Sequence, residues 1–261
     1  MTNNIAGLLA VSVAADPTRP LITWYDDATG DRTELSGTTL ANWVAKTANL
    51  VVDAAGAGRG DVAEVWLPAH WQTAAVLLGC WSAGLTVRAA GLAAGAAAGT
   101  STGATSSGGS GTATTTITAT PAEVVFAHVD HLADDLAAIG HRSAGERYLL
   151  SLAPMAAPIR QLPVGWADYV VEVRGQGDHF TPYPAIDPHD AQLATRARQR
   201  ATELEILPGS RILIDTDRYP DPVDWLLAPL VAEASVVLCR HLDQRQVAGR
   251  AERERVARSL I

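Results

Sequence analysis

The alternation of apolar and polar positions predicts a chain of short strands and helices. Runs at 20–25 and 62–67 are typical of strands, because they are rich in β-branched and aromatic residues and turn residues follow them. Between these runs, six mainly apolar positions recur at helical spacing: Leu40, Trp43, Val44, Thr47, Leu50 and Val51. The stretch from His70 to Ala83 is apolar on most faces, which indicates a buried helix, and 85–87 begins another strand.

The same alternation resumes in the second half of the chain. Short apolar runs predict four strands there: 123–129, 147–152, 211–215 and 235–239. A weaker strand is expected at 169–173, and helices are expected at about 190–204 and at 224–232. Strands that alternate with helices are typical of parallel βαβ units. The predicted fold class is therefore α/β, with a mostly parallel sheet and helices on both faces.

A change of composition divides the chain. Residues 91–120 consist of Gly, Ala, Ser and Thr with one Leu and one Ile, and they carry no charge. Such a stretch buries little apolar surface, so we expect a flexible loop. It separates a first α/β unit at 1–90 from a second unit of the same domain at 121–243. Residues 244–261 alternate in charge and predict an Arg-rich C-terminal helix with i,i+4 ion pairs.

Charge and cysteine content exclude several classes of function. The formal net charge is -8, from 28 acidic and 20 basic residues, which argues against nonspecific binding of nucleic acid. Cys80 and Cys239 lie in apolar runs and are expected as buried thiols rather than a disulfide. The N-terminus lacks a basic signal-peptide region, and the longest apolar stretch is too short for a membrane span. We therefore expect a soluble cytoplasmic protein that does not bind membranes.

Two segments carry a family resemblance. In residues 35–87, Gly60, Asp61, Pro68 and Gly84 fall into a Gly-Asp … Leu-Pro … Ala-Gly pattern, and residues 207–238 match a second βαβ half. Both segments resemble the N-terminal domain of the AMP-binding acyl-adenylate-forming enzymes, the acyl-CoA synthetase and adenylation superfamily. The chain is similar to a shortened, actinobacterial-type group of these proteins. The resemblance implies a partial N-domain of the adenylate-forming fold.

The resemblance also implies a phosphate-binding loop, and here the chain departs from the family pattern. The family holds ATP with a Ser/Thr/Gly-rich loop that ends in Pro-Lys-Gly. In that position the chain has residues 174–190, where Gly175, Gly177 and Thr181 suit such a loop but no lysine occurs. The family's ribose-binding aspartate and its second lysine, carried by a C-terminal domain, have no counterpart in the sequence. We therefore expect no ATP-dependent adenylation and no cofactor.

Lysine is almost absent from the chain. Lys46 is the only one among 20 basic residues, and it lies on the predicted helix that follows Ser36 and Thr38. The apolar positions of that helix leave Lys46 towards its solvent edge. We expect an exposed, solubilising side chain and a poor nucleophile.

The densest polar cluster is the other candidate for chemistry. Asp178, His179, Asp187, His189 and Asp190 lie within 13 residues, and a carboxylate-oriented histidine is suited to acid–base or metal chemistry. The alternative is a solvated, proline-punctuated loop. The sequence assigns no catalytic residue firmly and predicts no metal site, and Asp178, His179 and His189 are its weak catalytic candidates.

Three further histidines have structural interpretations. His128 and His131 flank Asp130 at the end of a predicted strand, where capping and surface roles are expected in place of a shared metal. His70 opens the buried helix, where core packing is expected in place of a pocket wall for an apolar ligand.

Two classes of function follow. The first is a noncatalytic relative of the adenylate-forming enzymes that binds a small molecule or a protein. The second is an enzyme with altered chemistry in the inherited cleft that uses the cluster at 178–189, or a half-enzyme that needs a separate lysine-bearing lobe. A homo-oligomer is a further alternative, because missing family domains leave an apolar face to cover.

Overall fold

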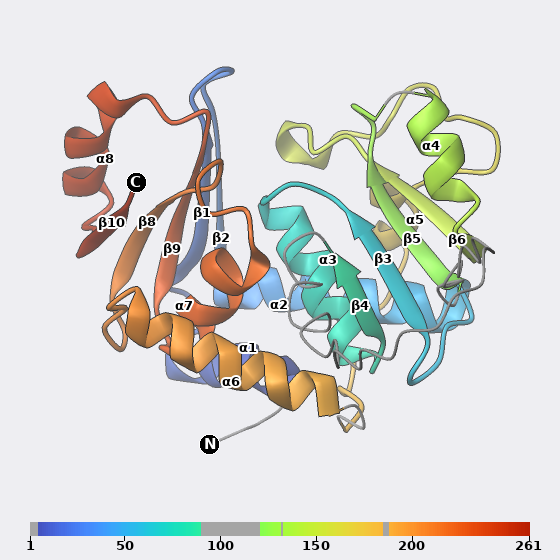
Figure 1. Cartoon of the computed structure of the whole chain (residues 1–261), viewed down its shortest axis with the longest axis horizontal. Helices are drawn as coiled ribbons and strands as arrows, with labels where there is room; N and C mark the ends of the chain where they lie inside the picture. The colour runs from blue at the N-terminus through green and yellow to red at the C-terminus, as the bar shows by residue number, and fades with distance from the viewer. Residues whose placement is uncertain (1–4, 90–120, 132, 185–187) are drawn as a thin grey trace, which may run out of the picture.

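The computed structural model describes residues 5–89, 121–131, 133–184 and 188–261, and they form two sheets (Figure 1). The first sheet has the order β10 (Arg258–Leu260), β8 (Arg211–Asp215), β9 (Ser235–Arg240), β1 (Pro20–Asp26) and β2 (Asp31–Ser36). The second has the order β4 (Thr86–Ala89), β3 (Val62–Trp66), β5 (Ala122–His128), β6 (Ser143–Leu150) and β7 (Ala167–Asp168). Within these residues, neighbouring strands are parallel except for the β1–β2 hairpin.

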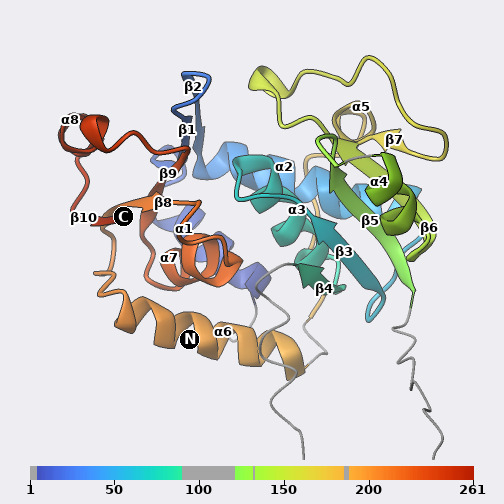
Figure 2. The ribbon, with the colours of Figure 1, turned by 45° about the horizontal axis from the view of Figure 1, so that its top comes forward.

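Helices fill the space where the sheets meet and cover their outer faces (Figure 2). The buried pair is α2 (Gly37–Asn49), extended by the π-helical turn η1 (Leu50–Ala54), and α3 (Trp71–Ser82). The helices α1 (Ile5–Ala15), α6 (Pro188–Glu203), η4 (Val223–Leu227) and α7 (Ala228–Val231) pack together on one side of the first sheet. The remaining helices are α4 (Ala133–Gly140), η3 (Pro154–Ala156), α5 (Tyr169–Arg174), η5 (Gln244–Gln246) and α8 (Val247–Arg253).

Both sheets take strands from both halves of the sequence. The first sheet joins β1 and β2 to β8, β9 and β10, and the second joins β3 and β4 to β5, β6 and β7. The predicted units at 1–90 and 121–243 are thus interleaved in space. The predicted flexible loop at 91–120 lies outside the described residues. The α/β class with mostly parallel sheets and helices on both faces is confirmed.

The close contact of α2 and α3 depends on a glycine. A Cβ atom added to Gly79 would lie 2.6 Å from Thr47 Cβ and 3.2 Å from the carbonyl oxygen of Val44. Trp43 packs edge-on against Trp71, with ring centroids 5.2 Å apart. The two helices therefore form one continuous apolar core with both sheets. Within the described ranges, no helix is long and apolar enough to cross a membrane.

Two predicted elements are wrong. The expected strand at 169–173 is helix α5, because the Asp168 carboxylate caps it by accepting hydrogen bonds from the backbone N–H groups of Val170 (2.7 Å) and Val171 (3.3 Å). The Arg-rich helix expected over 244–261 is limited to α8. Arg255 then adopts a positive φ of 53°, and the chain returns as β10 beside β8. The hairpin strand β2 was not predicted, since its sequence DRTELS is polar.

Candidate functional site

Residues 174–184 occupy the position where the resemblance implies a phosphate-binding loop, and α2 fixes this segment by its carbonyl groups. Lys46 Nζ donates hydrogen bonds to the carbonyl oxygens of Gln176 and Arg174, the latter at 3.4 Å. One turn further along the helix, Asn49 Nδ2 donates to the carbonyl oxygens of Gly177 (2.8 Å) and His179 (3.1 Å). Four carbonyls of the segment therefore point at α2. We call residues 174–184 the anchored segment.

The anchored segment lacks the free lysine ammonium that the family's phosphate-binding loop provides, because the only lysine of the chain is engaged by carbonyl oxygens. A loop that binds phosphate turns its backbone N–H groups inward and adds a cation, so that partial and full positive charges meet the anion. The ammonium group of Lys46, on α2, instead donates its hydrogen bonds to carbonyl oxygens of the anchored segment. Lys46 is half-buried and bonded, so its expected role as an exposed, solubilising side chain is corrected.

The rest of the anchored segment lies across α3 and the turn before β3. The Tyr183 N–H donates to the carbonyl oxygen of Ser82 at 2.9 Å, and Arg59 Nη2 donates to the carbonyl oxygen of Pro184 at 2.8 Å. Phe180 packs against the main core, and its ring centroid is 5.4 Å from that of Tyr183. The segment is therefore held along its length by three neighbouring elements.

The weak catalytic candidates do not form a site in the described part of the chain. Asp178 and His179 are exposed, and their side chains have no hydrogen-bond or ion-pair partner among the described residues. Asp187 and the side chains of His189 and Asp190 lie outside the described residues. The acid–base or metal cluster therefore stays a prediction.

The glycines and hydroxyl expected in a phosphate loop lie on the anchored segment. Gly175, Gly177 and Thr181 are all exposed. A Cβ atom on Gly177 would lie 3.3 Å from Asn49 Nδ2, so its lack of a side chain serves the contact with α2. Among the described residues, no group of three or more His, Cys, Asp or Glu side chains is arranged to hold a metal ion.

A cleft opens between the two sheets at the carboxyl ends of their parallel strands. Its volume is about 310 Å³. One wall comes from the ends of β3 and β4 and from α3, and the other from the segment after β8 and the last residue of β9. Ligands of open parallel sheets bind at this edge, because the loops that leave the strands converge there. We call it the carboxyl-edge cleft.

Arg240 is the basic side chain of the carboxyl-edge cleft. The apolar wall comprises Val65, Leu67, Pro68, Ala69, Leu77, Ala89, Pro220, Pro222 and Trp225. Thr73, Thr216 and Asp217 add polar atoms, and the Asp217 carboxylate accepts the backbone N–H of His241 at 2.7 Å. Arg240 is half-exposed, and its guanidinium has no carboxylate partner among the described residues. The cleft thus offers one cation, Arg240, and one carboxylate, Asp217, beside an apolar surface.

Burial, together with the charge of Arg240, lowers the pKa of two histidines, His70 and His128. Burial lowers the pKa of His70 to about 3, with further lowering by the charges of His128 and Arg240. His70 is therefore neutral, and its Nδ1 caps α3 by accepting the Gln72 N–H at 3.1 Å. Burial also lowers the pKa of His128, against the opposing effect of Asp130. Arg240 is the group that brings positive charge to this end of the cleft.

The contacts of His70, His128 and His131 show where each side chain lies. His70 is fully buried and packs edge-on against Trp24, with centroids 4.5 Å apart. His128 Nδ1 lies 3.4 Å from the Asp130 carboxylate, whereas His131 Nε2 lies 3.2 Å from the carbonyl oxygen of Trp66. His128 and His131 therefore engage different partners. Arg240 has no local sequence signal, and only the arrangement of the sheets identifies it.

Solved structures of acyl-CoA synthetases share this fold and this arrangement of sheets. The structure of Brucella canis acyl-CoA synthetase matches 98% of the chain with a TM-score of 0.66 and 18% identity, over 46% of its own length. The N-terminal domain of FACL13 from Mycobacterium tuberculosis matches 99% of the chain with a TM-score of 0.59 and 12% identity, over 62% of its own length. At these identities the likeness shows the fold alone: the N-domain fold of the adenylate-forming enzymes.

The family follows from a closer relative. No protein-family profile matches the chain. A "TIGR03089 family protein" of Mycobacterium tuberculosis is 35% identical over 261 residues, which cover 97% of this chain and 96% of the relative. The chain therefore belongs to the TIGR03089 family. It spans about half the length of the Brucella canis synthetase and nearly all of this relative.

Proposed function

We propose that the protein is a noncatalytic, ligand-binding relative of the adenylate-forming enzymes. The observation that carries this proposal is the anchored segment, in which Lys46 and Asn49 bind four backbone carbonyls. To meet an ATP phosphate, the Lys46 ammonium would have to leave the carbonyl oxygens of Arg174 and Gln176, because the chain has no second lysine. ATP-dependent activation of a carboxylate is therefore disfavoured at this position.

The ligand that suits the carboxyl-edge cleft is a small carboxylate with an apolar body. Arg240 supplies a fork of donors that matches a carboxylate, and the cleft volume of about 310 Å³ suits a ligand of few atoms. The apolar walls bury a hydrocarbon chain beside it. Acyl-CoA synthetases share this fold, and the class of ligand proposed here is the free acid without its activation.

Thermal unfolding with hexanoate as the probe tests this proposal. Binding to the folded state alone raises stability by mass action, and hexanoate at ten times its dissociation constant adds about 1.4 kcal/mol, equivalent to a few degrees in Tm. Arg240→Met is expected to abolish the shift, because its guanidinium is the carboxylate partner. Arg245→Met is the matched control, since Arg245 is exposed and pairs with Asp243 outside the cleft.

The outcomes separate the proposal from its alternatives. A Tm shift in the wild type and in Arg245→Met, lost in Arg240→Met, supports the proposal. A shift that persists in Arg240→Met overturns the assigned site, and the absence of any shift up to the solubility of hexanoate overturns the ligand class. A shift with ATP and Mg²⁺ that the Lys46→Met variant alters would overturn the claim that this segment does not bind ATP phosphates.

A further inference from the structure

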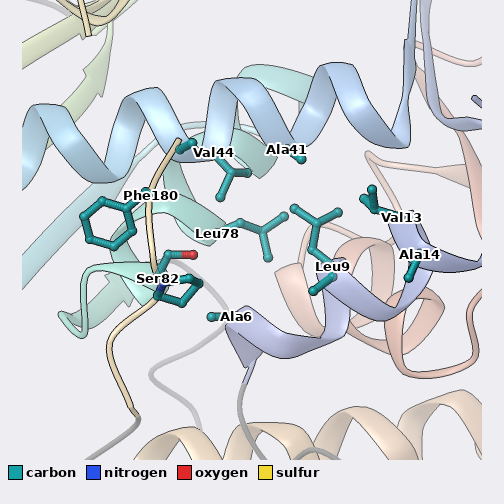
Figure 3. A pocket seen from close by; sticks show the side chains of 12 residues that line it. Ala6, Leu9, Val13, Ala14, Ala41, Val44, Leu78, Ser82 and Phe180 are labelled. Atoms are coloured by element: carbon teal, nitrogen blue, oxygen red, sulfur yellow. The ribbon is translucent and has the colours of Figure 1, made fainter. Parts of the chain in front are cut away.

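A second cavity lies away from the carboxyl-edge cleft, between three helices and the anchored segment (Figure 3). Its volume is about 360 Å³. Helix α1 forms one side, α2 and α3 form the other, and Phe180 of the anchored segment lies at one end. The Tyr183–Ser82 backbone bond and the Asn49 contacts hold that end in place. We call it the helix pocket.

The lining of the helix pocket is apolar with one exception. The apolar members are Ala6, Leu9, Ala10, Val13, Ala14, Ala41, Val44, Ala45, Leu78, Phe180 and Pro182. Ser82 supplies the hydroxyl, and its oxygen points into the space between the helices (Figure 3). Ser82 is only 4% exposed, and its hydroxyl has no hydrogen-bond partner among the described residues. None of the described residues that line the pocket is charged.

An unpartnered hydroxyl in an apolar pocket selects its ligand. A ligand that covers this hydroxyl displaces water from it, so a ligand that bonds to the hydroxyl gains more free energy than one that leaves it without a partner. A charged ligand would lose its hydration without finding a counter-ion in the lining. The pocket volume falls in the range that encloses small organic ligands, and its walls are already formed by packed helices.

We propose that the helix pocket binds a neutral, mainly apolar small molecule whose single polar group bonds to Ser82 Oγ. The anchored segment provides the wall that closes this pocket. The contacts that hold the anchored segment thus also complete a binding site between α1, α2 and α3. This site is separate from the carboxyl-edge cleft, and it takes a neutral ligand where the cleft takes a carboxylate.

Fluorescence of N-phenyl-1-naphthylamine, a neutral aromatic amine with a naphthyl and a phenyl group, tests the proposal on the full chain. We expect saturable enhancement at one site per chain, reversed by 1-octanol. Ala41→Leu fills the pocket from α2 and is expected to weaken probe binding at least tenfold. Ala54→Leu is the matched control, because it makes the same change at an exposed position at the end of η1. A thermal melt verifies that each variant is folded, and Ala45→Leu is a second filling variant.

A second pair of measurements tests the hydroxyl. Ser82→Ala is expected to weaken displacement by 1-octanol roughly two- to tenfold, the value of one hydrogen bond, and to leave displacement by toluene unchanged. Equal effects on both displacers would overturn the role of Ser82. Probe binding that survives both filling variants, or no saturable binding by the wild type, would overturn the pocket. Arg240→Met should bind the probe as the wild type does, so this test is independent of the cleft.

Discussion

Replacement of the single lysine tests whether it anchors the segment. Lys46→Met keeps the apolar stem but removes the ammonium group that donates to the carbonyl oxygens of Arg174 and Gln176. Hydrogen bonds from a charged donor contribute about 1.5–3 kcal/mol, and water can reach the partly exposed Gln176 carbonyl and replace part of that. We expect the free energy of unfolding to fall by about 1–2 kcal/mol. The Arg174 guanidinium also holds η3 by donating to the carbonyl of Ala156 at 3.0 Å, so loosening extends to η3.

Urea unfolding measures the global loss, and hydrogen exchange locates it. In Lys46→Met the amides of residues 175–183 should exchange faster, while those of β5 and β9 keep their relative protection. Asn49→Ala serves as the parallel variant, because it frees the carbonyls of Gly177 and His179 and should affect the same amides. Amine acetylation of the wild type provides a direct readout, since Lys46 is the only lysine to modify. Unchanged unfolding midpoints with unchanged exchange in both variants would refute the anchoring role.

Three further predictions concern buried groups outside the anchored segment. Because burial lowers the pKa of His70 from 6.5 to about 3, the unfolded chain binds the extra proton between these values. The free energy of unfolding is therefore unaffected by the titration of His70 above about pH 6.5, and below that pH it falls by up to about 1.4 kcal/mol per pH unit. His70→Asn, which retains a capping acceptor, should flatten the pH dependence of urea unfolding between pH 6.5 and 4, and an equal slope in both proteins would contradict this. Arg250 is 2% exposed and pairs with Asp27 at 2.5 Å. Arg250→Ala should cost about 3–5 kcal/mol by leaving that carboxylate buried and unpaired, and a loss below 1 kcal/mol in denaturant titrations would argue against the pair. Gly79→Ala should destabilise by about 1–3 kcal/mol despite the helix propensity of alanine, because its Cβ meets Thr47. Calorimetry that shows a raised Tm would contradict the close packing.

The fold was predictable wherever apolar runs decide the structure. The strands at 20–25, 62–67 and 211–215 were found because their β-branched and aromatic side chains fill a core between helices. The segment at 169–173 has the same composition, yet the Asp168 cap makes it helical. The amino-acid composition of this segment suits a strand as well as a helix, so composition alone does not reveal that Asp168 caps a helix. The end of α8 depends on pairing with β8, which lies about 45 residues earlier.

The site was less predictable, because its contacts join distant residues. Lys46 was placed on the correct helix, but its partners lie 128 and 130 residues away and are backbone oxygens without a sequence signature. Arg240 is the last residue of an ordinary strand, β9, and only the meeting of two sheets places it at a cleft. Ser82 ends an apolar helix, and its hydroxyl gains significance from the segment that folds over it. The resemblance supplied the fold and the position at which the family has its phosphate-binding loop.

ATP–pyrophosphate exchange measured with a panel of carboxylic acids tests the central claim most directly. The claim is that residues 174–184 are anchored by their carbonyls and do not bind ATP phosphates. A complete acyl-CoA synthetase provides the positive control. The account predicts no carboxylate-dependent exchange above the background without protein, in both the wild type and Lys46→Met. Exchange that depends on a carboxylic acid and on the wild-type chain would contradict it.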